Sequence, residues 1–175
     1  DEKLIKQYLP HYGDGLTLIL APHVIAESHL EFIENLFGKA NCVRYSQLAG
    51  TPTNSHILII DNFGMLSSLY RYAHVAYIGG GFGHGIHNTL EAITFGKPVV
   101  FGPNYHKFQE AHDIIAMGGG FTHDDYTQLQ QHLDLLFHDN VAYEKASAAC
   151  SQYLTSNLGS TDLILTKVGP ELDSK

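Results

Sequence analysis

The chain carries little positive charge and has no long apolar stretch. Ten lysines and arginines stand against 18 aspartates and glutamates, a formal net charge of −8, and the basic residues form no cluster. This balance argues against a nucleic-acid partner, because a phosphate backbone attracts clustered basic side chains. No apolar run approaches the ~20 residues that a membrane-spanning helix needs.

Cysteine motifs and catalytic nucleophile motifs are also missing. Cys42 and Cys150 are far apart and have no CxxC spacing, which predicts free thiols in a reducing compartment. There is no G-x-S-x-G motif and no partner set for a serine or cysteine nucleophile. The 12 histidines are scattered, and the close pair His84 and His87 has no carboxylate or cysteine at metal-ligand spacing. The sequence therefore predicts no nucleophilic hydrolase and no metal centre.

Residues 77–104 form the most informative stretch, which reads strand, glycine-rich turn, helix, strand, turn. The apolar run 75–78 stops at three consecutive glycines, as a buried parallel strand does. A second apolar run, 98–101, follows after roughly twenty residues, the length that a right-handed βαβ crossover needs. The stretch therefore predicts two parallel strands joined by a helix.

The helix between these strands is predicted to begin at Asn88, a favourable N-cap, with Glu91 in the capping-box position, and to end at Gly96. Glycines let a ligand approach the backbone, and a helix N-terminus offers unpaired N–H groups, so this geometry suits a phosphate. The loop matches neither the dinucleotide fingerprint nor the P-loop. On the glycines alone, a tight turn with an ordinary cap is an equal alternative.

Strands alternate with helices along the whole chain, which predicts one domain, residues 1–175, of α/β class. The expected architecture is a doubly wound, largely parallel sheet with helices on both faces, resembling a Rossmann fold. The predicted strands are 16–21, 42–45, 56–60, 75–78, 98–101 and 120–122, and the principal predicted helices are 1–8, 27–37, 65–72, 88–96, 107–117, 126–137 and 139–154. Ligands bind beyond the carboxyl ends of such strands, where the loops here are 22–23, 61–64, 79–85 and 102–104.

Three blocks of sequence at these loops carry a family resemblance. They are 60–66 with 69–70 and 73–76, then 78–80 with 87–92, and finally 96–99 with 102–104 and Phe108. Their order and spacing resemble the C-terminal domain of GT-B glycosyltransferases, and more closely that of the bacterial Kdo transferases. These enzymes move 3-deoxy-D-manno-oct-2-ulosonic acid (Kdo) from CMP-Kdo to the lipid A precursor. Met65 and Ile86 depart from the family pattern, which has a glutamate and a glycine there.

The resemblance implies a domain of a longer, two-domain glycosyltransferase. In that family an N-terminal domain holds the acceptor and the catalytic carboxylate, and the C-terminal domain holds the nucleotide sugar. The chain would then be a fragment with a C-terminal helical tail at 158–175 and no catalytic residue of its own, inactive when isolated. The resemblance also implies CMP-Kdo as the donor and the lipid A precursor as the acceptor, which the N-terminal domain would bind. It implies no metal or other cofactor. The domain itself would be soluble and cytoplasmic, and the full-length enzyme would lie at the cytoplasmic face of the inner membrane.

The resemblance assigns roles to particular residues. Glu91 would accept hydrogen bonds from ribose hydroxyls, its alternative being a capping box with Asn88. Asn88 and the N–H groups of residues 88–90 would face the phosphate. His87 would donate to the phosphate or to the Kdo carboxylate, or else be structural.

The other expected contacts come from the neighbouring loops. The implied substrate-binding set is Pro22, His23, Glu27, Gly64, Met65, Gly80, Gly81, Gly83, Gly85, His87, Asn88, Glu91, Asn104 and Lys107. In it the backbone at residues 64–65 would read the cytosine edge, with packing as the alternative role of Met65. The four glycines would allow close approach of the donor or only satisfy positive φ. Lys107 would neutralise the donor, or simply be solvated.

The implied reaction is displacement at the anomeric carbon with CMP as the leaving group. Two other functions stay open. A UDP-sugar transferase or epimerase of the same fold would use the same acid and the same glycine loop with a uracil reader. The other is a non-catalytic binding module, which predicts neither the expected nucleotide affinity nor its loss in Glu91→Ala.

Overall fold

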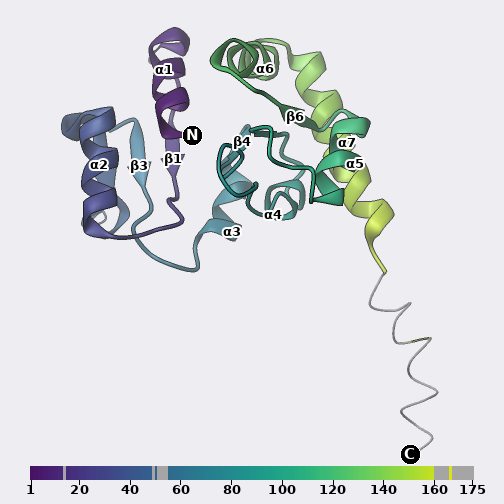
Figure 1. Cartoon of the computed structure of the whole chain (residues 1–175), viewed down its shortest axis with the longest axis horizontal. Coiled ribbons are helices and arrows are strands. Elements are labelled where there is room, and N and C mark those ends of the chain that lie inside the picture. Colours follow the sequence, from purple (N-terminus) through teal and green to yellow (C-terminus); the bar gives the residue numbers. More distant parts are fainter. Residues whose placement is uncertain (14, 49, 51–54, 160–165, 167–175) are drawn as a thin grey trace, which may run out of the picture.

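The computed structural model describes residues 1–13, 15–48, 50, 55–159 and 166, and within them the predicted parallel α/β fold is confirmed (Figure 1). The strands are β1 (Leu18–Leu20), β2 (Cys42–Arg44), β3 (Ile57–Ile59), β4 (Ala76–Ile78), β5 (Val99–Phe101) and β6 (Gly120–Thr122). The α-helices are α1 (Glu2–Tyr12), α2 (Glu27–Phe37), α3 (Leu66–Leu69), α4 (Leu90–Ile93), α5 (Gln109–Met117), α6 (Tyr126–His138) and α7 (Asn140–Asn157). The predicted tail at 158–175 lies outside the described residues, apart from 158, 159 and 166.

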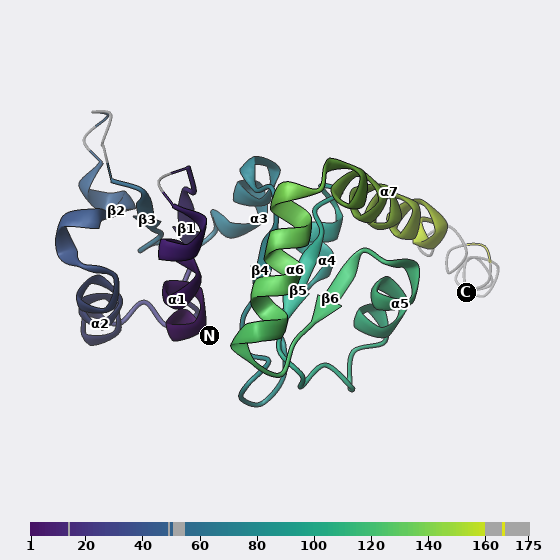
Figure 2. The same ribbon diagram turned by 90° about the horizontal axis from the view of Figure 1, so that it is seen from above.

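The strands form two three-stranded sheets, ordered β1-β3-β2 and β4-β5-β6, and every strand pairing described is parallel. The sequence predicted a single sheet, but the two half-sheets lie side by side without pairing to one another (Figure 2). β1 and β4 each stand at the end of their own half-sheet, so each keeps one edge without a partner strand in the described structure.

Helices cover both faces of the second half-sheet because alternate residues of a strand point to opposite faces. Val99 and Phe101 pack in one cluster with residues of α4, α5 and α7, whereas Val100 packs in another with residues of α1 and α6. All three residues of β5 are fully buried. On the first half-sheet, Ile57 and Ile59 pack against the apolar face of α2. Because the described pairings are all parallel, the carboxyl ends of the strands lie at one edge of each half-sheet.

Several helices have other bounds than predicted, since α3 ends at Leu69 and α7 runs to Asn157, and two further helices show the physical reason. The first helix does not end near Pro10 but continues to Tyr12, where the Tyr12 ring meets Phe137 edge-on at 5.0 Å between centroids. This contact stabilises the last turn even though proline cannot donate a backbone hydrogen bond. The helix after the glycines is only Leu90–Ile93, shorter at both ends than the predicted 88–96. Tertiary packing has therefore overridden local helix signals at both places.

Both cysteines are free thiols, as predicted. Cys150 is fully buried beneath α5 and β6, and this burial raises the pKa of its thiol to about 12. The thiol is therefore protonated and unreactive at neutral pH, because the thiolate is the nucleophilic form.

Arg44 is expected to stabilise the first half-sheet in a pH-dependent way. Its guanidinium donates to Glu34 (Nε to Oε1, 2.7 Å) and to Glu27 (Nη1 to Oε2, 2.8 Å). These hydrogen bonds hold the pKa of both carboxyl groups below the ordinary value of 4.5. A carboxyl group whose pKa is lower in the folded than in the unfolded protein stabilises the fold at pH values above its unfolded-state pKa. This stabilisation is lost as the pH falls through the folded-state pKa. Arg44→Met should therefore lower Tm by about 3 °C at pH 7 and have little effect near pH 3.

Thermal scans of the variant at the two pH values test this expectation. Lys3→Met, which removes an exposed positive charge from α1, is the matched control and should change Tm little at either pH. An equal loss for Arg44→Met at both pH values would show that packing of the side chain, and not the ion pairs, is responsible.

Candidate functional site

A cavity of about 1390 Å³ opens at the carboxyl ends of β1, β3 and β4, the edge at which the sequence predicted ligand binding. Its lining at this edge comes from three of the four predicted loops. The residues concerned are Pro22, His23, Asn62, Gly64, Gly79, Gly80, His87, Asn88 and Glu91. The fourth loop, residues 102–104, does not line it. The fold thus gathers most of the predicted loops around one cavity.

Glu91 and Asn88 form a hydrogen-bonded pair in this cavity. The Asn88 Nδ2 donates to Glu91 Oε1 at 3.1 Å, and the Asn88 Oδ1 accepts from the Leu90 N–H at 3.0 Å. The N-cap of α4 is Thr89 and not the predicted Asn88, whose side chain instead binds the Leu90 N–H and orients the acid. Glu91 is half-buried, and its Oε2 accepts no hydrogen bond from the described residues. The carboxylate thus faces the cavity with acceptor capacity to spare, instead of bonding its own backbone as in a capping box.

His87 and His23 bring the loops after β4 and β1 together. Their rings stack with centroids 4.9 Å apart and planes inclined by 22°. The backbone of His87 is fixed by its N–H, which donates to the carbonyl of Gly79 at 3.0 Å. Both side chains line the cavity, where their ring N–H groups suit an anionic ligand.

Tyr70 adds a hydroxyl to the same cavity. Burial, with a smaller contribution from the nearby Glu91 carboxylate, raises the pKa of Tyr70 to about 12. The phenol therefore stays protonated at physiological pH and keeps its ability to donate a hydrogen bond.

The glycine loop packs against itself instead of opening toward a ligand. The carbonyl of Gly80 accepts from the N–H of Gly83 at 2.9 Å and from that of Gly85 at 3.4 Å. A Cβ at Gly81 would lie 2.6 Å from the Cα of Gly102. Of the four glycines of this loop predicted as ligand contacts, Gly80, Gly81, Gly83 and Gly85, only Gly80 lines the cavity. Positive φ and close backbone packing therefore explain why glycine stands at most of these positions.

Several predicted contacts do not line the cavity. Glu27 is bound through both carboxylate oxygens by Arg44, at 2.8 Å each. The Asn104 side chain donates to the carbonyl of Gly83 at 2.9 Å and so secures the glycine loop. Met65 Sδ accepts from the Asn62 amide at 3.1 Å, and Lys107 is exposed. Contact of these residues with a ligand stays a prediction, and the structure gives three of them a structural role.

Two polar residues near the site were missed from the sequence. Asn62 Oδ1 and Thr89 Oγ1 are buried and have no hydrogen-bond partner among the described residues. Asn62 lines the cavity directly, and Thr89 lies between Asn88 and the α4 helix. A buried polar atom without a partner is uncommon and costs stability, so each is a candidate for contact with a ligand or water. Only their position inside the sequence blocks 60–66 and 87–92 pointed to them.

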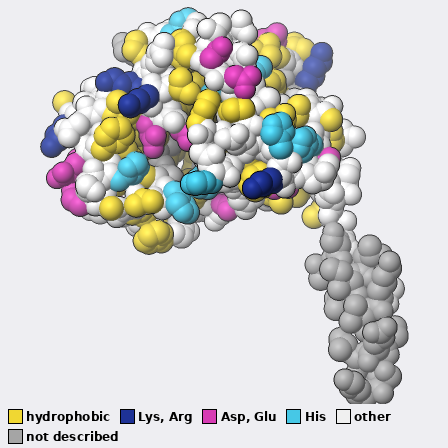
Figure 3. Space-filling view, viewed as in Figure 1, with side chains coloured by type: hydrophobic (Ala, Val, Ile, Leu, Met, Phe, Trp, Pro, Cys, Tyr) yellow, Lys and Arg dark blue, Asp and Glu magenta, His cyan; other side chains and the backbone are white. Residues whose placement is uncertain are grey.

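The described lining contains no lysine or arginine. Its ionisable residues are the acids Asp1, Glu2 and Glu91, the histidines His23, His29, His74 and His87, and several tyrosines. On the face seen in Figure 3, lysine and arginine side chains are scattered, whereas histidines gather in groups. No group of three or more His, Cys, Asp or Glu in the described part of the chain is placed to hold a metal ion. An anion in this cavity would rely on histidines, hydroxyls and backbone N–H groups.

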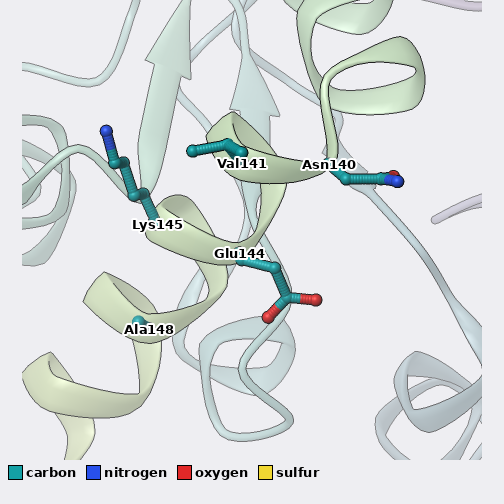
Figure 4. A pocket seen from close by; sticks show the side chains of 5 residues that line it. All are labelled: Asn140, Val141, Glu144, Lys145 and Ala148. Carbon is teal, nitrogen blue, oxygen red and sulfur yellow. The ribbon is translucent and has the colours of Figure 1, made fainter.

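A second hollow lies on the surface of α7 and is shallow and open. It is lined by Asn140, Val141, Glu144, Lys145 and Ala148, whose side chains splay apart instead of converging (Figure 4). No residue of the predicted site borders it. The strand-edge cavity is therefore the candidate site.

The architecture is the Rossmann-like α/β arrangement that the sequence predicted by its resemblance to the C-terminal domain of GT-B glycosyltransferases. A solved structure shows the same fold: the C-terminal CMP-Kdo binding domain of WaaA from Acinetobacter baumannii matches with a TM-score of 0.74. The match covers 87% of this chain and 83% of that chain at 21% sequence identity. No protein-family model matches the sequence.

Curated relatives confirm the predicted resemblance to the bacterial Kdo transferases. The 3-deoxy-D-manno-octulosonic acid transferase of Aquifex aeolicus is 31% identical over 129 residues, which cover 73% of this chain and 35% of that protein. The Haemophilus influenzae enzyme of the same name is 26% identical over 99% of this chain and 42% of its own length. The chain thus spans about two fifths or less of these relatives.

Within the described residues, no helix combines the length and the apolar character needed to cross a bilayer.

Proposed function

We propose that this chain is the donor-binding domain of a Kdo transferase and that its strand-edge cavity holds CMP-Kdo. The observation that carries the proposal is the Asn88–Glu91 pair, which lines the cavity and stands in a block of sequence that resembles the Kdo transferase pattern. A carboxylate with a free oxygen can accept hydrogen bonds from both hydroxyls of a ribose. Glu91 would therefore fix the nucleoside, with Asn88 holding its orientation.

The remaining lining suits the anionic part of the donor. His87 and His23 stand across the cavity mouth from the loops after β4 and β1 and can donate to the phosphate or to the Kdo carboxylate. Asn62, with its unpaired buried oxygen, can accept from the amino group of a cytosine. We do not assign the phosphate to the α4 N-terminus, because a helix of four residues has little macrodipole.

The full-length enzyme would displace CMP at the anomeric carbon of Kdo. The role of this domain is to hold the leaving group and to stabilise the charge that develops on its phosphate. An acceptor domain would bind the lipid A precursor at the cytoplasmic face of the inner membrane and supply the carboxylate that takes the acceptor's proton. We propose that no metal takes part, so CMP affinity should be the same with and without EDTA.

Calorimetric titration with CMP and with UDP tests the proposal. The chain should bind CMP with a Kd of about 0.1–1 mM, as expected for part of a substrate in half of a site, and UDP several-fold more weakly. Tighter binding of UDP would favour a UDP-sugar enzyme of the same fold. Binding of neither nucleotide by natively folded protein would refute the donor-site proposal.

A further inference from the structure

The two stacked histidines at the mouth of the strand-edge cavity have no bound counter-ion. His23 and His87 are both exposed, and their ring centroids lie 4.9 Å apart. Across the described residues, no ion pair joins either ring to an acid. Of the other histidines that line the cavity, His29 pairs with Glu2 at 3.7 Å (Nε2 to Oε1) and His74 stacks on a tyrosine ring. The stacked pair is thus a set of two titratable groups whose charge no fixed partner holds.

The acids that line the cavity or follow its strands are each engaged by another group, and they are Asp1, Glu2, Glu27, Asp61 and Glu91. Asp1 accepts through both carboxylate oxygens, from the Gly80 N–H at 2.9 Å and from the Tyr77 hydroxyl at 3.0 Å. Glu91 keeps one oxygen, which the proposed function gives to the ribose. Because the described lining also holds no lysine or arginine, the positive charge that meets a bound anion would have to come from histidine.

The His87 ring lies between the glycine loop and the acid assigned to the ribose. A Cβ built at Gly80 would lie 3.4 Å from the His87 Nε2, so this nitrogen is beside the first turn of the loop. His87 also directly precedes Asn88, whose amide holds Glu91. A phosphate attached to a ribose at Glu91 would therefore be within reach of His87 and of His23, which stacks on it. A neutral imidazole can donate to that phosphate, but a charged one binds it more strongly.

We propose that CMP binding is coupled to the uptake of a proton by the His23–His87 pair, which then holds the phosphate as an imidazolium. Without an anion, two stacked rings disfavour a second positive charge, because like charges repel at this separation. A phosphate dianion reverses this, since an opposite charge within about 4–6 Å favours the charged form. The proton comes from the solvent and goes to a ring nitrogen. The inference rests on the proposed function, which supplies the anion, and adds a proton as a second ligand of the site.

Calorimetric titration with CMP at pH 7.5, once in Tris and once in HEPES, counts the proton, because the two buffers differ in ionisation enthalpy. The phosphate of CMP is already mostly a dianion at this pH, so any uptake comes from the protein. About half a proton or more should be taken up per CMP bound, and the Kd should rise about fivefold between pH 7 and pH 8.5. Binding of CMP without proton uptake would overturn this inference and leave the donor-site proposal standing. No binding at all would refute both.

A double variant and an NMR measurement show where the proton goes. His23→Gln combined with His87→Gln keeps an N–H donor at each position but cannot take up a proton, so the uptake and the pH dependence of Kd should disappear. His84→Gln is the matched control and should keep both, because His84 is exposed on the glycine loop and does not line the cavity. Full uptake by the double variant would contradict the inference.

In the unaltered chain, the Cε1–H signals of His23 and His87 should move toward the position of a charged imidazole when CMP is added at constant pH 7.5. Signals that stay in place while CMP binds would also overturn the inference.

Discussion

Replacing Glu91 by glutamine should lower the affinity for CMP by about ten- to a hundredfold and leave the fold intact. Hydrogen bonds to a charged group contribute about 1.5–3 kcal/mol, and the amide of glutamine keeps only one acceptor oxygen. Glu91 is half-buried and bonds no backbone group in the described structure, so its loss removes little from the folded state. Calorimetric titration gives the affinity, and circular dichroism with thermal unfolding verifies the fold.

Glu144→Gln is the matched control for this variant. Glu144 is exposed on α7 and borders the shallow hollow of Figure 4, which shares no residue with the strand-edge cavity. The control changes the net charge by the same amount and should leave CMP affinity unchanged. Equal losses in the two variants would attribute the effect to overall charge, and no loss in Glu91→Gln would remove the acid from the site.

Replacing Gly80 by alanine should destabilise the domain by about 2–4 kcal/mol. Gly80 has φ +90, and a Cβ built there would lie 2.4 Å from the carbonyl oxygen of Gly85. That oxygen belongs to backbone, so the clash cannot be relieved by a rotamer change. The turn after β4 would have to open, which would also shift His87. Urea unfolding gives the free energy of unfolding, and CMP affinity should fall with it.

Gly118→Ala separates backbone strain from this clash. Gly118 has φ +84, close to that of Gly80. Apart from its nearest neighbours in the chain, no heavy atom of the described residues lies within 4 Å of a Cβ built there. Alanine at Gly118 should therefore cost only about 1–2 kcal/mol, the penalty of left-handed backbone. If the two alanine variants were equally destabilised, the tight packing of the glycine loop would contribute nothing to stability.

The class of the fold was predictable because its signals are local. Strands such as β5 are short apolar runs bounded by turn residues, and the amphipathic period of α2 is visible in its buried positions Leu30, Ile33 and Phe37. The division into two half-sheets was not predictable. It depends on which strand edges find partners, and strand pairing is a long-range property of the folded chain.

The site was predictable in part for the same reason. Asn88 and Glu91 are three residues apart, so their pairing follows from local geometry. The role of Glu27 was not visible, because its partner Arg44 lies 17 residues further on and β2 places it beside α2. The unpaired oxygen of Asn62 also arises from tertiary burial. The hydrogen bond between Asn88 and Glu91 thus follows from their spacing, whereas contacts with distant partners do not.

An NMR titration of the ¹⁵N-labelled chain with CMP tests the central claim most directly. If the nucleotide occupies the strand-edge cavity, the largest shift changes will fall on the amides of Gly80, Asn88 and Glu91, whereas those of α7 around Glu144 will stay in place. Saturating shifts elsewhere, or none at millimolar CMP in a spectrum of native dispersion, would contradict it.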